Sequence, residues 1–123
     1  MTTPRSALVV DDERDIRELL VLTLGRMGLR VDTAADLSSA RAQLAQGSYD
    51  LCLTDMRLPD GSGQDLIEHI AQRYPDTPVA MITAFGNVEA AVQALKAGAF
   101  DFVTKPVDLT VLRRLVQHAL DLN

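Results

Sequence analysis

The run Val79-Ala-Met-Ile-Thr83 decides the fold class, because four apolar residues stand there with no polar residue between them. A strand with one wet face alternates apolar and polar residues, whereas a strand covered on both faces is apolar throughout. The same character predicts further buried strands at Ala7-Leu-Val-Val10, Leu51-Cys-Leu-Thr54 and Phe102-Val-Thr104. An alternating pattern, which is typical of an edge strand, is formed by Leu29, Val31 and Thr33.

Helical patterns fill the segments between these runs, with apolar residues at steps of three and four. The five stripes are Ile16, Leu19, Leu20, Thr23 and Met27; Leu37, Ala40, Arg41 and Leu44; Leu66, Ile67 and Ile70; Val88, Ala91, Val92 and Leu95; and Leu112, Leu115, Val116 and Ala119. Start signals precede four of them, at Asp36, Ser62, Asn87 and Asp108. Five successive strand-then-helix units predict an α/β fold, with a parallel sheet covered by helices on both faces.

Composition narrows the classes of function. The chain has 123 residues, which fits one domain, and a net charge of −5 excludes bulk affinity for nucleic acid or an anionic membrane. The single cysteine, Cys52, excludes an internal disulfide and a cysteine-rich zinc site. No apolar stretch has the roughly 20 residues of a membrane span, and no secretory signal is visible. A cytoplasmic domain is therefore expected.

Polar residues of types that are common in active sites follow the predicted strands. Asp11 and Asp12 follow the first strand, and the third ends at Asp55. Thr83 ends the fourth, and Lys105 follows the fifth. In an α/β sheet of this kind, functional groups gather at the carboxyl ends of the strands. Three carboxylates, a hydroxyl and an ammonium group are therefore predicted to converge at one edge of the sheet.

This set of residues indicates Mg²⁺ and phosphate chemistry. Carboxylates close together repel one another, at a cost of about 4 kcal/mol per contact at 4 Å in a medium of intermediate dielectric. A hard divalent cation and a lysine offset that cost, and oxygen ligands without His or Cys favour Mg²⁺ over zinc. An aspartate can then attack phosphorus to form an acyl phosphate, while the cation and lysine stabilise the phosphoryl oxygens.

The motifs at these strand ends resemble those of response regulator receiver domains of two-component systems. The matching stretches, in family order, are Val9-Val-Asp-Asp-Glu13, Leu53-Thr-Asp-Met-Arg-Leu-Pro-Asp-Gly61, Met81-Ile-Thr-Ala84 and Phe102-Val-Thr-Lys-Pro106. The resemblance implies that residues 1–123 form one receiver domain. It also implies a flavodoxin-like (CheY-like) doubly wound sheet of five parallel strands in the order 2-1-3-4-5, with five helices.

The resemblance also implies a role for each site residue. Asp55 is the expected acceptor of a phosphoryl group from a sensor histidine kinase. The expected Mg²⁺ ligands, with Mn²⁺ as a substitute ion, are Asp55, Asp12, Asp11 largely through water, and the backbone carbonyl of Arg57. Lys105 is expected to bind phosphate and to precede a cis peptide bond to Pro106.

Other residues are expected to transmit or tune the signal. Thr83 and Phe102 form the implied switch pair, although position 102 is often Tyr in this family. Arg57 and Phe85 are expected to tune the lifetime of the phosphate. Kinase specificity is expected on the first helix, around Asp15, Arg17, Leu19 and Leu20, and in the loop after the fifth strand.

The stretch from Thr83 to Asp108 is most similar to receivers of NtrC-type regulators. Those proteins join the receiver to an AAA+ ATPase and a helix-turn-helix domain and activate sigma-54-dependent transcription. Such output domains are absent from this chain, which has no Gly-x-x-x-x-Gly-Lys loop. A homodimer on activation is expected, and its candidate face contains Lys96, Asp101, Arg113 and Arg114.

Two alternatives stay open at the level of sequence. The haloacid dehalogenase superfamily also uses an aspartate nucleophile, Mg²⁺, threonine and lysine. Its nucleophile follows the first strand and its acidic pair comes late, which is the reverse of the order here. The second alternative is a degenerate receiver that signals by binding alone. Such domains usually lack an acidic residue or the lysine, whereas this chain has both. A signalling domain is therefore expected rather than an enzyme with a free substrate.

Overall fold

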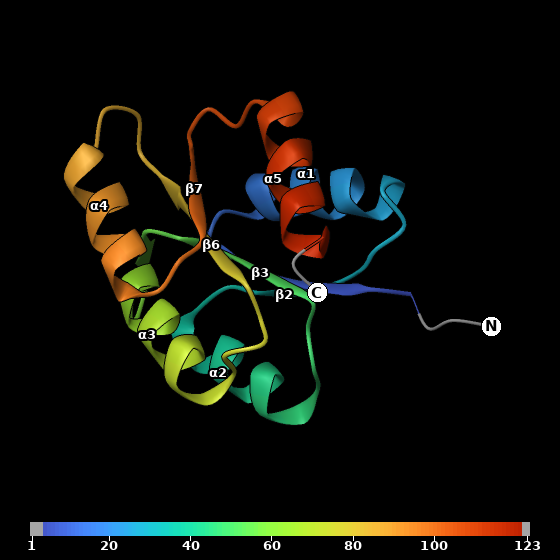
Figure 1. Ribbon diagram of the computed structural model, residues 1–123, viewed down its shortest axis with the longest axis horizontal. Helices are drawn as coiled ribbons and strands as arrows, with labels where there is room; N and C mark the ends of the chain where they lie inside the picture. Colours follow the sequence, from blue (N-terminus) through green and yellow to red (C-terminus); the bar gives the residue numbers. More distant parts are fainter. Residues whose placement is uncertain (1–3, 122–123) are drawn as a thin grey trace.

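A parallel five-stranded sheet forms the centre of this computed structural model, which describes residues 4–121 (Figure 1). The strand order is β2-β1-β3-β6-β7. The predicted order 2-1-3-4-5 is confirmed, because β6 and β7 are the fourth and fifth strands of the sheet. The strands are β1 (Ser6–Val10), β2 (Arg30–Ala34), β3 (Leu51–Asp55), β6 (Val79–Thr83) and β7 (Asp101–Thr104).

Helices cover both faces of the sheet, as predicted for a doubly wound fold (Figure 1). One face carries α1 (Arg14–Arg26) and α5 (Leu109–Asp121); the other carries α2 (Leu37–Gln46), α3 (Gly63–Arg73) and α4 (Val88–Ala97). Successive residues of β1 enter opposite cores: Val9 packs among residues of α1 and α5, and Val10 among residues of α2 and α3. Both cores need apolar side chains from β1, which explains its unbroken apolar sequence.

The predicted helix starts are confirmed by side-chain caps. The side chains of Asp36, Ser62 and Asn87 each accept a hydrogen bond from a backbone amide of the following first turn. Asp108 accepts from the amides of Thr110 and Val111 in the same way. Capping satisfies amides that have no partner within the helix. Each of these four helices therefore starts where its polar residue stands.

A short hairpin after β3 is an addition to the predicted elements. β4 (Arg57–Leu58) and β5 (Gly61–Ser62) pair antiparallel, with Arg57 opposite Ser62. The sequence predicts only a turn at Pro59-Asp-Gly61. Strands of two residues are too short to produce an alternating pattern, so their pairing is visible only in three dimensions.

Two predictions about burial are wrong. Phe102 and Thr104 are exposed and only Val103 is buried, because β7 is an edge strand. On α4, the predicted apolar stripe is largely exposed: Val88 is 71% and Leu95 is 44% exposed. Of that stripe only Ala91 is buried, and α4 reaches the core through Ala91 and Ala94. The spacing of apolar residues indicates that a helix forms, but it does not show which of those residues the rest of the protein buries.

None of the helices within residues 4–121 is long and apolar enough to span a bilayer.

Candidate functional site

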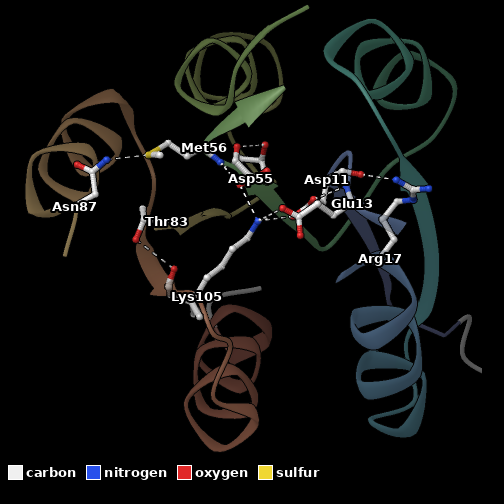
Figure 2. A network of polar contacts seen from close by, with 10 residues as sticks. Asp11, Glu13, Arg17, Asp55, Met56, Thr83, Asn87 and Lys105 are labelled. Atoms are coloured by element: carbon white, nitrogen blue, oxygen red, sulfur yellow. Dashed lines mark hydrogen bonds and ion pairs between the residues drawn. The ribbon is translucent and has the colours of Figure 1, made fainter. Parts of the chain in front are cut away.

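The predicted site residues meet at the carboxyl edge of the sheet (Figure 2). Asp11 directly follows β1, Asp55 is the last residue of β3, and Lys105 directly follows β7. Because these strands are parallel, their carboxyl ends lie at the same edge. Residues nearly a hundred positions apart in the chain therefore share one small site.

The ammonium group of Lys105 lies among three carboxylates. Its Nζ atom is 3.4 Å from Oδ1 of Asp55, 3.5 Å from Oδ2 of Asp11 and 3.5 Å from Oε1 of Glu13. The Lys105 side chain is 23% exposed, so these ion pairs are only partly screened by solvent. One cation thus faces an excess of negative charge.

The acidic cluster has the donor set of a hard divalent cation. Asp11, Asp12 and Asp55 each offer a carboxylate oxygen, and these oxygens lie within 4.8 Å of one another. Asp11 is fully buried, and its Oδ2 atom has no hydrogen-bond partner although its Oδ1 accepts from the Glu13 amide at 2.8 Å. A buried oxygen without a hydrogen bond is costly unless a cation faces it, and Lys105 at 3.5 Å supplies only one positive charge for these three carboxylates. The residues present therefore fit Mg²⁺.

Burial controls the protonation of this cluster. Loss of solvent raises the pKa of Asp11 and of Asp55, and the nearby negative charge adds to both shifts, although Lys105 and the backbone amides of Glu13 and Met56 oppose them. Burial acts to lower the pKa of Lys105, but the surrounding carboxylates outweigh it and the net shift is upward. The charged lysine is thus favoured, whereas each ionised aspartate is destabilised without a second cation.

A prediction about stability follows from the raised pKa of Asp55. A folded-state pKa above the unfolded value means that the free energy of unfolding falls as pH rises through the folded-state pKa. At neutral pH without divalent metal, Asp55→Asn is therefore expected to be more stable than the parent, by about 1 kcal/mol or a few degrees in Tm. This advantage should shrink as acidification neutralises Asp55 in the parent. Thermal unfolding in EDTA at neutral and acidic pH measures it, and a variant less stable than the parent at neutral pH would contradict it.

Of the expected switch residues, Thr83 ends β6 beside this cluster, and Phe102 lies on β7 three residues before Lys105 (Figure 2). The Thr83 hydroxyl is buried and donates to the backbone carbonyl of Val103 at 3.4 Å, which is a long hydrogen bond. Phe102 is 37% exposed and lines an apolar groove of about 140 Å³ with residues of α4. The peptide bond between Lys105 and Pro106 is cis.

Most of the remaining predicted residues lie at the surface, but Leu20, expected at the kinase-recognition surface, is fully buried in the core shared with α5. Arg57 is exposed in β4, and Phe85 is 85% exposed in the loop before α4. The expected dimer-face residues lie on or beside α4, β7 and α5, where Asp101 is half-buried and the others are exposed: Lys96, Asp101, Arg113 and Arg114. Their role as a dimer face stays a prediction.

Sequence reasoning missed several contacts of the site (Figure 2). Glu13 contributes a carboxylate to Lys105, and its place two residues after Asp11 was the only signal. The Met56 amide donates to Oδ1 of Asp55, and the Met56 sulfur accepts from the Asn87 side chain at 3.3 Å. Arg17, expected on the kinase-facing surface, donates to the backbone carbonyl of Asp11 at 2.8 Å. No residue pattern in the sequence predicts the contact of the Met56 sulfur with Asn87 or the contact of Arg17 with the Asp11 carbonyl.

Comparison with similar proteins indicates the family of this chain. The profile of the family described as response regulator receiver domain matches residues 7–117. The chain is 64% identical over 118 residues to the response regulator protein PilR of Pseudomonas aeruginosa, covering 96% of this chain and 26% of that protein. It is 39% identical to the DNA-binding transcriptional regulator NtrC of Azospirillum brasilense, covering 94% and 24%. The chain thus spans about a quarter of the length of these relatives.

Solved structures agree with the fold. The receiver domain of NtrX from Brucella abortus superposes with a TM-score of 0.89 at 38% identity, covering 94% of this chain and 98% of that one. The beryllofluoride-activated NtrC4 receiver domain dimer gives a TM-score of 0.88 at 34% identity, covering 94% and 96%. Since the family profile spans nearly all of the sequence and these likenesses agree with it, the chain belongs to the response regulator receiver domain family, among the receivers of NtrC-type regulators.

Proposed function

We propose that this domain is a phosphorylation-dependent switch that accepts a phosphoryl group on Asp55 from a sensor histidine kinase. The observation that carries the proposal is the contact of Lys105 Nζ with Asp55 and Asp11. These two residues and Asp12 have carboxylate oxygens within 4.8 Å of one another. A nucleophilic carboxylate, a cation for phosphoryl oxygens and ligands for Mg²⁺ are then all in one place.

The geometry supports a direct transfer to Asp55. Its Oδ1 atom is held by the Met56 amide at 2.8 Å and faces Lys105, so Oδ2 is the oxygen we expect to attack. A bond forms from that oxygen to phosphorus as the bond from phosphorus to the kinase's histidine nitrogen breaks, and the electron pair leaves with the imidazole. Lys105 is placed to bind a phosphoryl oxygen as charge develops there. Bound Mg²⁺, held by Asp11, Asp12, Asp55 and the Arg57 carbonyl, would supply further neutralisation of that charge.

Phosphorylation would then change the surface formed by α4, β7 and α5. The long bond from Thr83 to Val103 is weak, so the hydroxyl can turn toward a phosphoryl oxygen at low cost. Phe102 lies at the groove beside α4 and can move inward when Thr83 turns. The exposed apolar side chains of α4 make this surface suited to binding a partner. The phosphoryl group would shift the population between two conformers rather than create a new one.

The partner of that surface is proposed to be a second copy of the domain or the output domain of the full protein. The NtrC4 receiver with a similar fold is described as a dimer, which supports the first. The relatives are about four times longer than this chain, which leaves room for output domains that control transcription. Such output is a proposal for the whole protein.

The decisive test is phosphorylation by a small donor. The domain is incubated with acetyl phosphate and MgCl₂, and its intact mass is measured with and without EDTA. We expect the gain of one phosphoryl group, lost on chelation. A folded protein that gains no mass under any of these conditions would contradict the proposal and favour a module that signals by binding alone.

A second prediction concerns the cation itself. MgCl₂ is expected to raise the Tm of the parent, because a ligand at ten times its Kd stabilises the folded state by about 1.4 kcal/mol. Asp12→Asn should lose most of this response, because it removes one of the expected carboxylate ligands. Since Asp12 is exposed, its replacement leaves the core intact. Asp15→Asn, an equal change of charge in the first turn of α1, should keep it. Equal responses of the two variants to MgCl₂ would show that Asp12 is not a ligand.

A further inference from the structure

Arg17 makes an unusual contact for a surface arginine of α1. Its Nη1 atom donates a hydrogen bond of 2.8 Å to the backbone carbonyl oxygen of Asp11, and the residue is half-buried (Figure 2). Within residues 4–121, no carboxylate lies within ion-pair distance of Arg17. Its neighbour Arg14 behaves differently, since it pairs with Glu18 on the surface and its side chain is 81% exposed. The two arginines therefore share a helix and a charge but not an environment.

The contacted carbonyl belongs to the peptide that joins Asp11 to Asp12. A peptide unit is planar, so a fixed carbonyl oxygen also fixes the direction of the next amide and Cα atom. Two further polar atoms of Asp11 are anchored as well: its amide donates to the Ala34 carbonyl at 3.1 Å, and its Oδ1 accepts from the Glu13 amide. Arg17 thus supplies the restraint that extends from Asp11 to Asp12.

We propose that Arg17 is a positioning residue of the cation site. By holding the peptide between Asp11 and Asp12, it directs both carboxylates toward one cation, although its own side chain is not a ligand. The proposal rests on the proposed function, because it concerns the same Mg²⁺. It gives Arg17 a role beyond the kinase recognition expected from sequence. Groups that orient metal ligands typically change affinity by about 10- to 100-fold when removed.

The charge of Arg17 alone predicts the opposite effect of its removal on Mg²⁺ binding, so the two explanations can be distinguished. Arg17 carries a positive charge near the place of a divalent cation, and like charges repel. If charge were the only influence of Arg17, its removal would strengthen Mg²⁺ binding. Weaker binding after removal therefore indicates a loss of geometry rather than a change of charge.

The test compares Mg²⁺ binding of matched variants by NMR titration of backbone amides with MgCl₂. Arg17→Met keeps the apolar stem and removes the donor, and its Kd for Mg²⁺ is expected to rise about tenfold. Arg14→Met removes the same charge from the same helix, and its Kd is expected to equal that of the parent or to be lower. Arg17→Lys is expected to recover part of the affinity, because an ammonium group can still donate one hydrogen bond.

A metal-free readout accompanies the titration. In EDTA, the Asp12 amide signal of Arg17→Met is expected to shift, whereas signals from central strand residues such as Leu53 should not. A Kd for Arg17→Met equal to or below that of the parent overturns the proposal, as does an unmoved Asp12 signal. If the parent itself binds no Mg²⁺, the proposed function fails and this proposal fails with it, which is a distinct result.

Discussion

Replacement of Asp55 by asparagine is expected to abolish phosphorylation by acetyl phosphate. The amide of asparagine keeps the shape of the side chain and can still accept from the Met56 amide, but it has no charged oxygen to attack phosphorus. Removal of a nucleophile lowers a rate to background, on the order of a thousandfold or more. The measurement is intact mass against time in MgCl₂, with the parent at the same concentration.

The control for this variant is Asp76→Asn, which makes the same change of charge at an exposed residue in the loop before β6. That loop leads into the amino end of a strand, at the edge of the sheet away from the candidate site. Asp76→Asn is expected to gain one phosphoryl group as fast as the parent. Phosphorylation of Asp55→Asn at the parent's rate would place the acceptor elsewhere and contradict the assignment. The stability of Asp55→Asn in EDTA at neutral pH, expected to exceed that of the parent, separates lost chemistry from lost folding.

The second large effect is expected at Gly63, the first residue of α3. Gly63 is buried, and its amide donates to the Met56 carbonyl at 2.9 Å. A Cβ atom built on Gly63 would overlap the backbone carbonyl oxygen of Asp55 and lie 3.2 Å from Cε of Met81. Backbone cannot move aside as a flexible side chain can. Either α3 must withdraw from β3, or the segment that carries Asp55 must shift.

Gly63→Ala is therefore expected to lower the free energy of unfolding by about 3 kcal/mol, the upper end of the range for overpacking. That corresponds to a loss of about 10 °C in Tm for a domain of this size. Where the variant is still folded, its phosphorylation is expected to slow by about a hundredfold, because a reacting group displaced by about 1 Å loses its alignment. Urea unfolding gives the first quantity and intact mass against time gives the second.

Gly25→Ala is the matched control. A Cβ at Gly25 meets no atom within 4 Å, and the residue lies inside α1. Alanine there is expected to add up to about 1 kcal/mol of stability, because glycine has a low helix propensity. If Gly63→Ala were as stable as Gly25→Ala, the close approach of α3 to Asp55 would be wrong.

Much of this protein could be predicted from local sequence. Unbroken apolar runs such as Val79-Ala-Met-Ile-Thr83 predicted inner strands, because a strand covered on both faces needs apolar side chains on both. The alternation of strands with capped helices predicted a parallel sheet. A parallel sheet brings its carboxyl ends to one edge, so the meeting of Asp11, Asp55 and Lys105 was predictable without coordinates. These features follow from the period of the apolar residues, the order of the strands and helices and the direction of the strands, all of which can be inferred from the sequence.

Other features depended on the placement of whole elements. The exposure of Val88 and Leu95 follows from α4 packing through its alanines, and the direction of the Thr83 hydroxyl follows from the position of β7. The contact of Arg17 with a carbonyl and the overlap that bars a side chain at Gly63 involve backbone atoms. Every residue has a backbone carbonyl, so the sequence cannot show which one a side chain will meet. Packing distances and angles between elements decide such contacts, and only the tertiary structure sets them.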